Sequence, residues 1–275
     1  MSQMRLIDED EQEISFQSQK IKRKIVVLSG KGGVGKSTVA TNLALAFAKK
    51  FGKGKVGIID LDLSGPNIPK MLGIEDKKVQ AAVKSPVETG KELLEPVEGP
   101  LGLKVVSMGF FLETRSTPVV WRGPIKIKAL RQFMDDFDWG ELEILIFDMP
   151  PGTGDEALSV MQLLPEMDGV VIVTTPQEVA LLDTGKSLTM SREMQRPVIG
   201  IVENMATFQC PNCGTQHPIF GEGGGQRLAK EFNTDLLGQI PLDPVIRVKE
   251  DQGISKPFDY FVPIVDRILE KIDSA

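Results

Sequence analysis

The chain has 275 residues, of which 41% are hydrophobic and 25% are charged, a composition typical of a globular protein rather than of a disordered chain or a coiled coil. Its 32 lysines and arginines against 38 aspartates and glutamates give a formal net charge of −6, which disfavours nucleic acid as a partner. A single histidine and two cysteines disfavour histidine-dependent triads, multi-histidine metal sites and a disulfide framework.

The first 23 residues differ in character from the rest of the chain. An acidic cluster is followed by a basic one, and the apolar residues show no periodic spacing. We expect residues 1–23 to form a flexible tail and residues 24–275 to form one domain. The acidic start is unlike a secretory signal, and the apolar runs are much shorter than the roughly 20 residues of a membrane span. The sequence therefore predicts a cytoplasmic protein without a membrane partner.

From residue 25 onward, short apolar runs alternate with stretches of helical periodicity. Such runs suit strands buried on both faces. The predicted strands cover residues 25–28, 56–59, 103–106, 144–147, 170–173 and 198–202. The predicted helices lie near residues 40–48, 125–137, 155–164, 179–194, 225–232 and 261–272. The predicted fold class is therefore α/β, a mostly parallel sheet flanked by helices, in which residues 64–101 form an elaborated, proline-rich connection.

Directly after the first predicted strand, the chain matches the phosphate-loop pattern G-x-x-x-x-G-K-[ST]. Glycines let the backbone wrap around phosphate oxygens, and the following helix adds the positive end of its dipole. We expect Lys36 to neutralise the β- and γ-phosphates of a nucleotide and Ser37 to offer its hydroxyl to Mg²⁺. The predicted nucleotide-binding residues of the loop are Gly30, Lys31, Gly32, Gly33, Val34, Gly35, Lys36, Ser37 and Thr38.

Acidic residues follow two of the predicted strands. Asp60 and Asp62 come after the strand at 56–59, and Asp148 comes after the strand at 144–147. Because the carboxyl ends of parallel strands face the ligand crevice, we expect these carboxylates to lie beside the phosphate loop. Asp148 is the candidate for holding Mg²⁺ through water, Asp62 for orienting the attacking water, and Asp60 for a supporting position behind them.

Cys210 and Cys213 form a compact C-x-x-C motif, in which two thiolates can face one metal. Zinc and iron-sulfur sites usually need four protein ligands, which a twofold dimer would supply. A three-ligand zinc site that includes His217 and a redox pair are the alternatives. A thioredoxin-like pair should lie where a strand enters a helix, whereas this pair is followed by the sequence GTQHP. The motif by itself leaves metal and redox roles about equally open.

Together, these motifs resemble the Mrp/ApbC family of iron-sulfur cluster carrier ATPases, which is related to MinD and ParA. The loop GKGGVGKS resembles that of the deviant Walker A group of ATPases, and the resemblance covers residues 24–256. The cysteine motif is its most discriminating match. The other matching segments are residues 60–62, 65–69, 121–124, 148–155 and 175–178.

The resemblance implies a P-loop homodimer that binds ATP, hydrolyses it slowly, assembles a subunit-bridging [4Fe-4S] cluster and transfers it to apo-proteins. The cluster would come from an assembly scaffold. Lys31 would cross the dimer interface and stabilise transition-state charge at the partner's nucleotide, so it joins Lys36 and Asp62 in the predicted catalytic set. Asn204 matches the family's adenine-side asparagine, and Asp243 lies near the same pocket by analogy. The resemblance implies Cys210 and Cys213 as cluster ligands, alongside Ser37 and Asp148 at Mg²⁺.

Two other functions fit parts of the sequence. A MinD- or ParA-like positioning ATPase would need a membrane helix or a DNA-binding surface. The helix at 261–272 has an outer face of mixed charge, so we expect it to dock on the core instead. A zinc-stabilised nucleotide-binding scaffold would use the cysteines without transferring a cluster. The segment at Trp121 fits packing and partner docking equally well, and residues 1–23 hold no cysteine for a second cluster.

Overall fold

A central eight-stranded sheet organises the computed structural model, which describes residues 20–62, 65–81, 93–112, 123–164 and 167–274. The strands, in their order across the sheet, are β12 (Leu236–Gln239), β9 (Val198–Glu203), β8 (Gly169–Thr174), β1 (Lys24–Ser29), β7 (Ile144–Asp148), β2 (Val56–Asp60), β6 (Lys104–Ser107) and β5 (Val97–Glu98). The edge strand β5 is antiparallel to β6, and the other neighbours pair in parallel. Every strand predicted from the sequence is present in this sheet.

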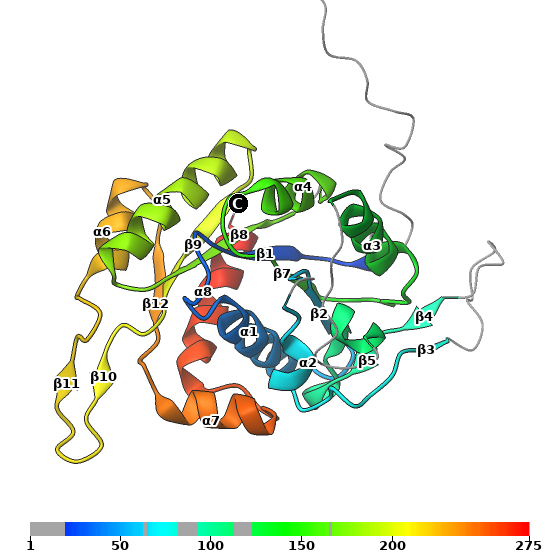
Figure 1. Cartoon of the computed structure of the whole chain (residues 1–275), viewed down its shortest axis with the longest axis horizontal. Helices are drawn as coiled ribbons and strands as arrows, with labels where there is room; N and C mark the ends of the chain where they lie inside the picture. The colour runs from blue at the N-terminus through cyan, green and yellow to red at the C-terminus, as the bar shows by residue number, and fades with distance from the viewer. Residues whose placement is uncertain (1–19, 63–64, 82–92, 113–122, 165–166, 275) are drawn as a thin grey trace, which may run out of the picture.

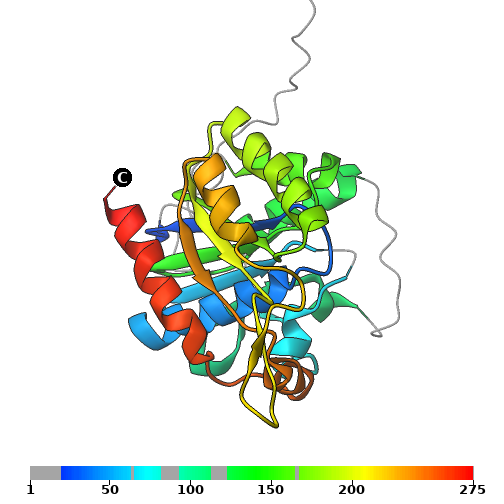
Figure 2. The same cartoon turned by 90° about the vertical axis from the view of Figure 1, so that its left-hand side faces the viewer.

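Helices cover both faces of the sheet, as Figures 1 and 2 show. The core on one side includes side chains of α1 (Lys36–Phe51), α2 (Ile68–Met71), α7 (Pro244–Gln252) and α8 (Val262–Asp273). The core on the other side includes side chains of α3 (Gly123–Asp135), α4 (Asp155–Leu163), α5 (Glu178–Glu193) and α6 (Gly224–Glu231). The predicted α/β class, a mostly parallel sheet flanked by helices, is confirmed.

Several small elements were not predicted. The strands β3 (Gln80–Ala81) and β4 (Leu94–Glu95) form one hairpin, and β10 (Phe208–Gln209) and β11 (Gln216–His217) form another. Short 3₁₀ turns span Pro100–Gly102, Met108–Phe111 and Asp259–Phe261. The start of α7 could have been predicted from the sequence, because Asp243 is a typical N-cap residue and Pro244 suits the first helical position.

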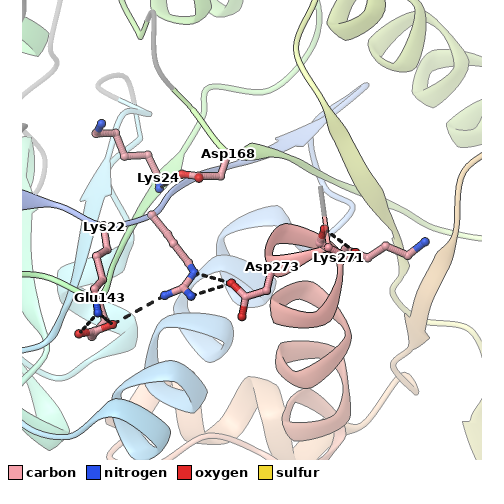
Figure 3. Close-up of polar contacts among 8 residues, drawn as sticks. Lys22, Lys24, Glu143, Asp168, Lys271 and Asp273 are labelled. Carbon is pink, nitrogen blue, oxygen red and sulfur yellow. Dashed lines mark hydrogen bonds and ion pairs between the residues drawn. The ribbon is translucent and has the colours of Figure 1, made fainter.

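The packed part of the chain begins before the predicted domain boundary at residue 23. Ile21 is buried and forms a parallel bridge with Leu142. Arg23 is 2.6 Å from Asp273 and 3.7 Å from Glu143, and Lys22 also pairs with Glu143 (Figure 3). Residues 20–23 therefore contact the domain, whereas residues 1–19 lie outside the described residues, as Trp121 does.

The C-terminal helix α8 docks on the core as predicted. Ile264, Val265, Ile268 and Leu269 are buried along one of its faces. Gly238 of β12 permits this close packing, because a Cβ there would lie 2.6 Å from the Ile264 side chain. Among the described residues, no helix is both long enough and apolar enough to span a membrane.

We expect Ile268→Ala to lower the free energy of unfolding by about 2–5 kcal/mol, because Ile268 is fully buried and its truncation leaves a cavity. Urea unfolding measures this loss. Val262→Ala, at a position on the same helix that is 38% exposed, is the control and should change stability by about 0.5 kcal/mol or less. Equal losses in the two variants would show that α8 is not docked.

Candidate functional site

The phosphate loop, residues 30–38, connects β1 to α1 at the carboxyl edge of the sheet. Gly33 and Gly35 both have φ of 81°, in the left-handed region that favours glycine. Gly35 is the N-cap of α1, and no side chain caps this helix start. Uncapped N–H groups at the positive end of a helix dipole suit an anion. The loop backbone therefore fits a nucleotide phosphate.

Asp148, at the end of β7, contacts two side chains of the phosphate loop. Its Oδ1 accepts a hydrogen bond from Lys36 Nζ at 2.6 Å, and its Oδ2 accepts one from Ser37 Oγ at 2.6 Å. The Lys36 and Asp148 side chains are only 6% and 1% exposed. The three residues thus lie together as predicted. The side-chain oxygens of Ser37 and Asp148 lie close enough to share a Mg²⁺ ion.

Asp60 lies beside Asp148, since the two residues are register partners in β2 and β7. Its Oδ2 accepts hydrogen bonds from Ser107 Oγ at 3.0 Å and from Ile68 N at 3.3 Å. Its Oδ1 is buried without a hydrogen-bond partner among the described residues. Burial, together with the negative charge of Asp148, raises the pKa of Asp60 to about 8, although Lys36 opposes this shift.

Asp62 lies just beyond β2 in a more open position. Its Oδ1 accepts a hydrogen bond from Gly65 N at 3.2 Å. Burial raises the pKa of Asp62, while the positive charge of Lys36 and the bond from Gly65 act in the opposite direction. The electrostatic effect of Lys36 shows that Asp62 lies near the phosphate loop. Its role in orienting water stays a prediction.

The two residues predicted on the adenine side take different positions. Asn204 follows β9 and is buried, and its Nδ2 donates to the carbonyl of Val34 in the phosphate loop at 2.9 Å. A Cβ at Gly35 would lie 2.2 Å from Asn204 Nδ2, so only glycine permits this approach. Asp243 instead accepts a hydrogen bond from Val245 N at 2.8 Å and caps α7. The structure thus brings Asn204, but not Asp243, into hydrogen-bonding contact with the loop in the part of the chain that it describes.

Residues 206–220, which we call the cysteine arm, project from the domain as the hairpin of β10 and β11 (Figure 1). Its tip is a tight turn, in which Cys210 N donates to Thr215 O at 2.9 Å and Gly214 N donates to Cys210 O at 2.9 Å. Hydrogen bonding to Thr215, and less strongly to Cys210, lowers the pKa of the exposed Cys213 thiol. The tight turn and the lowered pKa of Cys213 both favour metal binding by thiolates.

The alternative zinc site with His217 is not formed. His217 lies opposite Phe208 in the hairpin ladder, away from the tip that carries the cysteines. No group of three or more potential histidine, cysteine, aspartate or glutamate metal ligands occurs among the described residues. One copy of the chain therefore offers two sulfur ligands at this position.

Comparison with known proteins identifies the family. Residues 20–272 match the family model of the NUBPL iron-transfer P-loop NTPases, of the ParA group. The chain belongs to this family. The resemblance predicted from the sequence motifs is thereby confirmed, and the phosphate loop described above is the nucleotide-binding loop that defines P-loop NTPases.

Relatives of this NUBPL-family chain match it along most of its length. An iron-sulfur cluster carrier protein from Methanocaldococcus jannaschii is 47% identical over 275 residues, covering 98% of this chain and 91% of the relative. A cytosolic Fe-S cluster assembly factor, the NUBP2 homolog of Dictyostelium discoideum, is 45% identical and covers 88% of this chain and 89% of its own.

Solved structures share the fold of this NUBPL-family chain. A nucleotide-binding protein from Archaeoglobus fulgidus in complex with ADP has a TM-score of 0.77 and 40% identity, covering 90% of this chain and 93% of that one. The cell division ATPase MinD from Pyrococcus furiosus has a TM-score of 0.58 at 22% identity, covering 90% of this chain and 99% of its own. The MinD likeness shows the fold alone.

Sequence reasoning missed Glu250, on α7. Its Oε1 is buried and has no hydrogen-bond partner within the described part of the chain. Burial raises the pKa of Glu250 to about 7, and hydrogen bonding with Thr38 of the phosphate loop opposes this shift. No motif links the two residues, so only their proximity in the folded domain identifies Glu250.

We expect Asp60→Asn to make folding stability less dependent on pH. A carboxyl whose pKa is raised from 3.8 to about 8 in the folded protein binds more protons there than in the unfolded chain between these values. Its contribution to stability is therefore largest at low pH and falls as pH rises toward 8. Urea unfolding at pH 5.5 and pH 8 should show a smaller decrease for the variant than for the wild type.

The control for this experiment is Asp235→Asn, because Asp235 is exposed and pairs with Lys271 on the surface. This variant should keep the pH dependence of the wild type. If Asp60→Asn kept it too, Asp60 would not be the buried acid described above.

Proposed function

We propose that the protein is an ATP-hydrolysing carrier of iron-sulfur clusters, which holds a [4Fe-4S] cluster between two copies of the chain and transfers it to apo-proteins. The observation that carries this proposal is the presence, in one NUBPL-family domain, of a phosphate loop bonded to Asp148 and a projecting arm with two exposed or half-exposed thiols. The relatives named as cluster carriers and assembly factors support it.

The phosphate loop and its neighbours would hold the nucleotide. The N–H groups of residues 30–38 bind the phosphates, and Lys36 neutralises their charge. Ser37 and Asp148, whose side-chain oxygens are 2.6 Å apart, would hold Mg²⁺, which supplies further neutralisation of phosphate charge. Asn204 reaches the loop from β9 and would select the base, with Asp243 as the second predicted adenine-side residue.

Hydrolysis would need groups that act on the transition state. Asp62 lies near the phosphate loop and has its pKa raised by burial, which suits a carboxylate that orients a water molecule. Lys31 lies in the loop and would act on the nucleotide of the second copy, as an arginine finger does. Turnover is slow because the catalytic set is complete only in the dimer.

We expect Lys31→Ala to lower kcat for ATP hydrolysis by about tenfold or more while changing the KM for ATP by about twofold or less. A charge that contacts only the transition state contributes to kcat and not to ground-state binding. Steady-state phosphate release measures both constants. Lys49→Ala, at an exposed position near the end of α1, is the matched control and should leave both unchanged.

Two results would contradict the action of Lys31 on the nucleotide of the second copy. If Lys31→Ala hydrolysed ATP at the wild-type rate, or if it lost nucleotide binding as Lys36→Ala should, Lys31 would be an ordinary contact within its own loop. Mixing Lys31→Ala with a Lys36→Ala protein tests the same point, because the Lys36→Ala copy supplies Lys31 to the site that still has Lys36. One of the two sites in the mixed dimer should therefore regain activity, whereas each variant alone should stay impaired.

The cluster is cargo, and the cysteine arm would carry it. Four thiolates complete a [4Fe-4S] cluster, and isologous symmetry brings two copies of the same short motif together. The lowered pKa of the Cys213 thiol favours the thiolate that iron requires. An exposed site on a projecting hairpin suits release to an apo-protein better than permanent electron storage. The cluster itself would be received from an assembly scaffold.

We expect anaerobic reconstitution to give about four irons per dimer and to shift the protein toward the dimer. Cys210→Ala and Cys213→Ala should each lose the cluster, because a dimer of either variant keeps two thiolates rather than the four that complete the cluster. Asn212→Ala, which lies between the cysteines and keeps both thiols, is the control. Iron and sulfide analysis with light scattering checks the result.

Three outcomes would contradict the carrier proposal. Stable iron loading in a strict monomer would exclude the bridging cluster, and stoichiometric zinc without iron-sulfur absorption would favour a zinc-stabilised scaffold. Equal activation of an apo-acceptor by wild type and by both cysteine variants would exclude transfer. The ATPase assignment would survive each of these results.

A further inference from the structure

The cysteine arm leaves the domain at a corner that also touches the phosphate loop. Asn204, two residues before the arm, donates through its backbone N–H to Thr174 O at 2.8 Å and through its side chain to Val34 O at 2.9 Å. Ala206, the first residue of the arm, donates to Ile240 O at 2.9 Å. The corner is therefore held on both sides by hydrogen bonds.

Met205 lies between these two anchored residues and has an unfavourable backbone conformation. Its φ is +57°, in the left-handed region that residues other than glycine, asparagine and aspartate rarely adopt. Such a conformation persists only where the surroundings enforce it, and it is concentrated at functional sites. The Met205 methyl group also lies 3.8 Å from the position that a Cβ on Gly35 would take, so its side chain reaches the phosphate loop.

The two ends of the arm differ in backbone conformation. At the first end, Leu242 N donates to Thr207 O at 2.7 Å, immediately after the Met205 corner. At the second end, Gly221 and Gly223 have φ of 105° and 66°, values that glycine adopts without strain. The first end of the arm therefore turns at a strained methionine, whereas the second end turns at glycines.

We propose that Met205 is a positioning residue that couples the phosphate loop to the cysteine pair. A nucleotide that displaces Val34 or Asn204 moves the corner, and the rigid left-handed backbone of Met205 passes that displacement to the arm. The accessibility of Cys210 and Cys213 then depends on nucleotide occupancy. This coupling rests on the proposed function for the identity of the nucleotide and of the cargo, but it needs no bound cluster to be observed.

The test measures thiol reactivity in the full chain without a cluster. The modification rate of the cysteines by a disulfide reagent is compared with and without saturating Mg²⁺ and a non-hydrolysable ATP analogue. We expect the nucleotide to change the wild-type rate by about fivefold or more, the lower end of ordinary allosteric coupling. Met205→Gly should reduce the change to about twofold or less, because glycine releases the corner.

Two control variants separate this coupling from general effects of the substitution. Met205→Leu keeps a Cβ and an apolar side chain, and it should retain the wild-type response. Gln195→Gly replaces another left-handed residue, with φ of 56° at the end of α5, and it should also behave as wild type. Calorimetry on each variant establishes that the analogue still binds at the concentration used.

The coupling is overturned if the wild-type rate does not respond to the nucleotide, or if Met205→Gly and Met205→Leu respond equally while both bind it. A failure of the carrier proposal would give a different result from a failure of the coupling. A wild-type protein that takes up no iron and sulfide, but keeps a nucleotide response that Met205→Gly loses, supports the coupling and removes only the cluster as cargo.

Discussion

The buried bonds from Lys36 and Ser37 to Asp148 are the interaction on which the site depends. A lysine and a carboxylate that are nearly inaccessible to water can remain charged only if they are paired at short distance. The pairing requires that β7 lie directly beside β1, so that the end of β7 meets the start of α1. The parallel sheet therefore brings the buried carboxylate of Asp148 to the uncapped start of α1.

The raised pKa of Asp60 follows from the same arrangement of adjacent strand ends. Two carboxylates at adjacent strand ends in a buried site disfavour each other's charged form, and Lys36 pairs with Asp148. Asp60 keeps hydrogen bonds from Ser107 and Ile68, and its pKa is raised. Asp60 is therefore a mostly neutral acid near pH 7, beside the Asp148 carboxylate that pairs with Lys36.

The cysteine arm differs from the phosphate-loop site in its burial and in its contacts with the domain. It is exposed, is held by a short ladder, and contacts the domain mainly at its roots. Its cysteines lie on an exposed turn, whereas Lys36 of the phosphate loop is buried. Asn204 and Met205 lie between the phosphate loop and the cysteine arm. The exposed cysteine hairpin therefore leaves the domain beside the phosphate loop, and Asn204 joins the two through its bond to Val34.

The sequence by itself determined the sheet class, the phosphate loop and the cysteine motif, because each rests on local periodicity or spacing that tertiary contacts do not change. It also indicated that Asp148 lies beside the loop, since parallel strands end at one edge. The tertiary structure alone decided that Lys36 pairs with Asp148, that Asn204 reaches Val34, and that Glu250 lies near Thr38. These contacts join residues far apart along the chain, and their partners are selected by packing and burial, which no local pattern encodes.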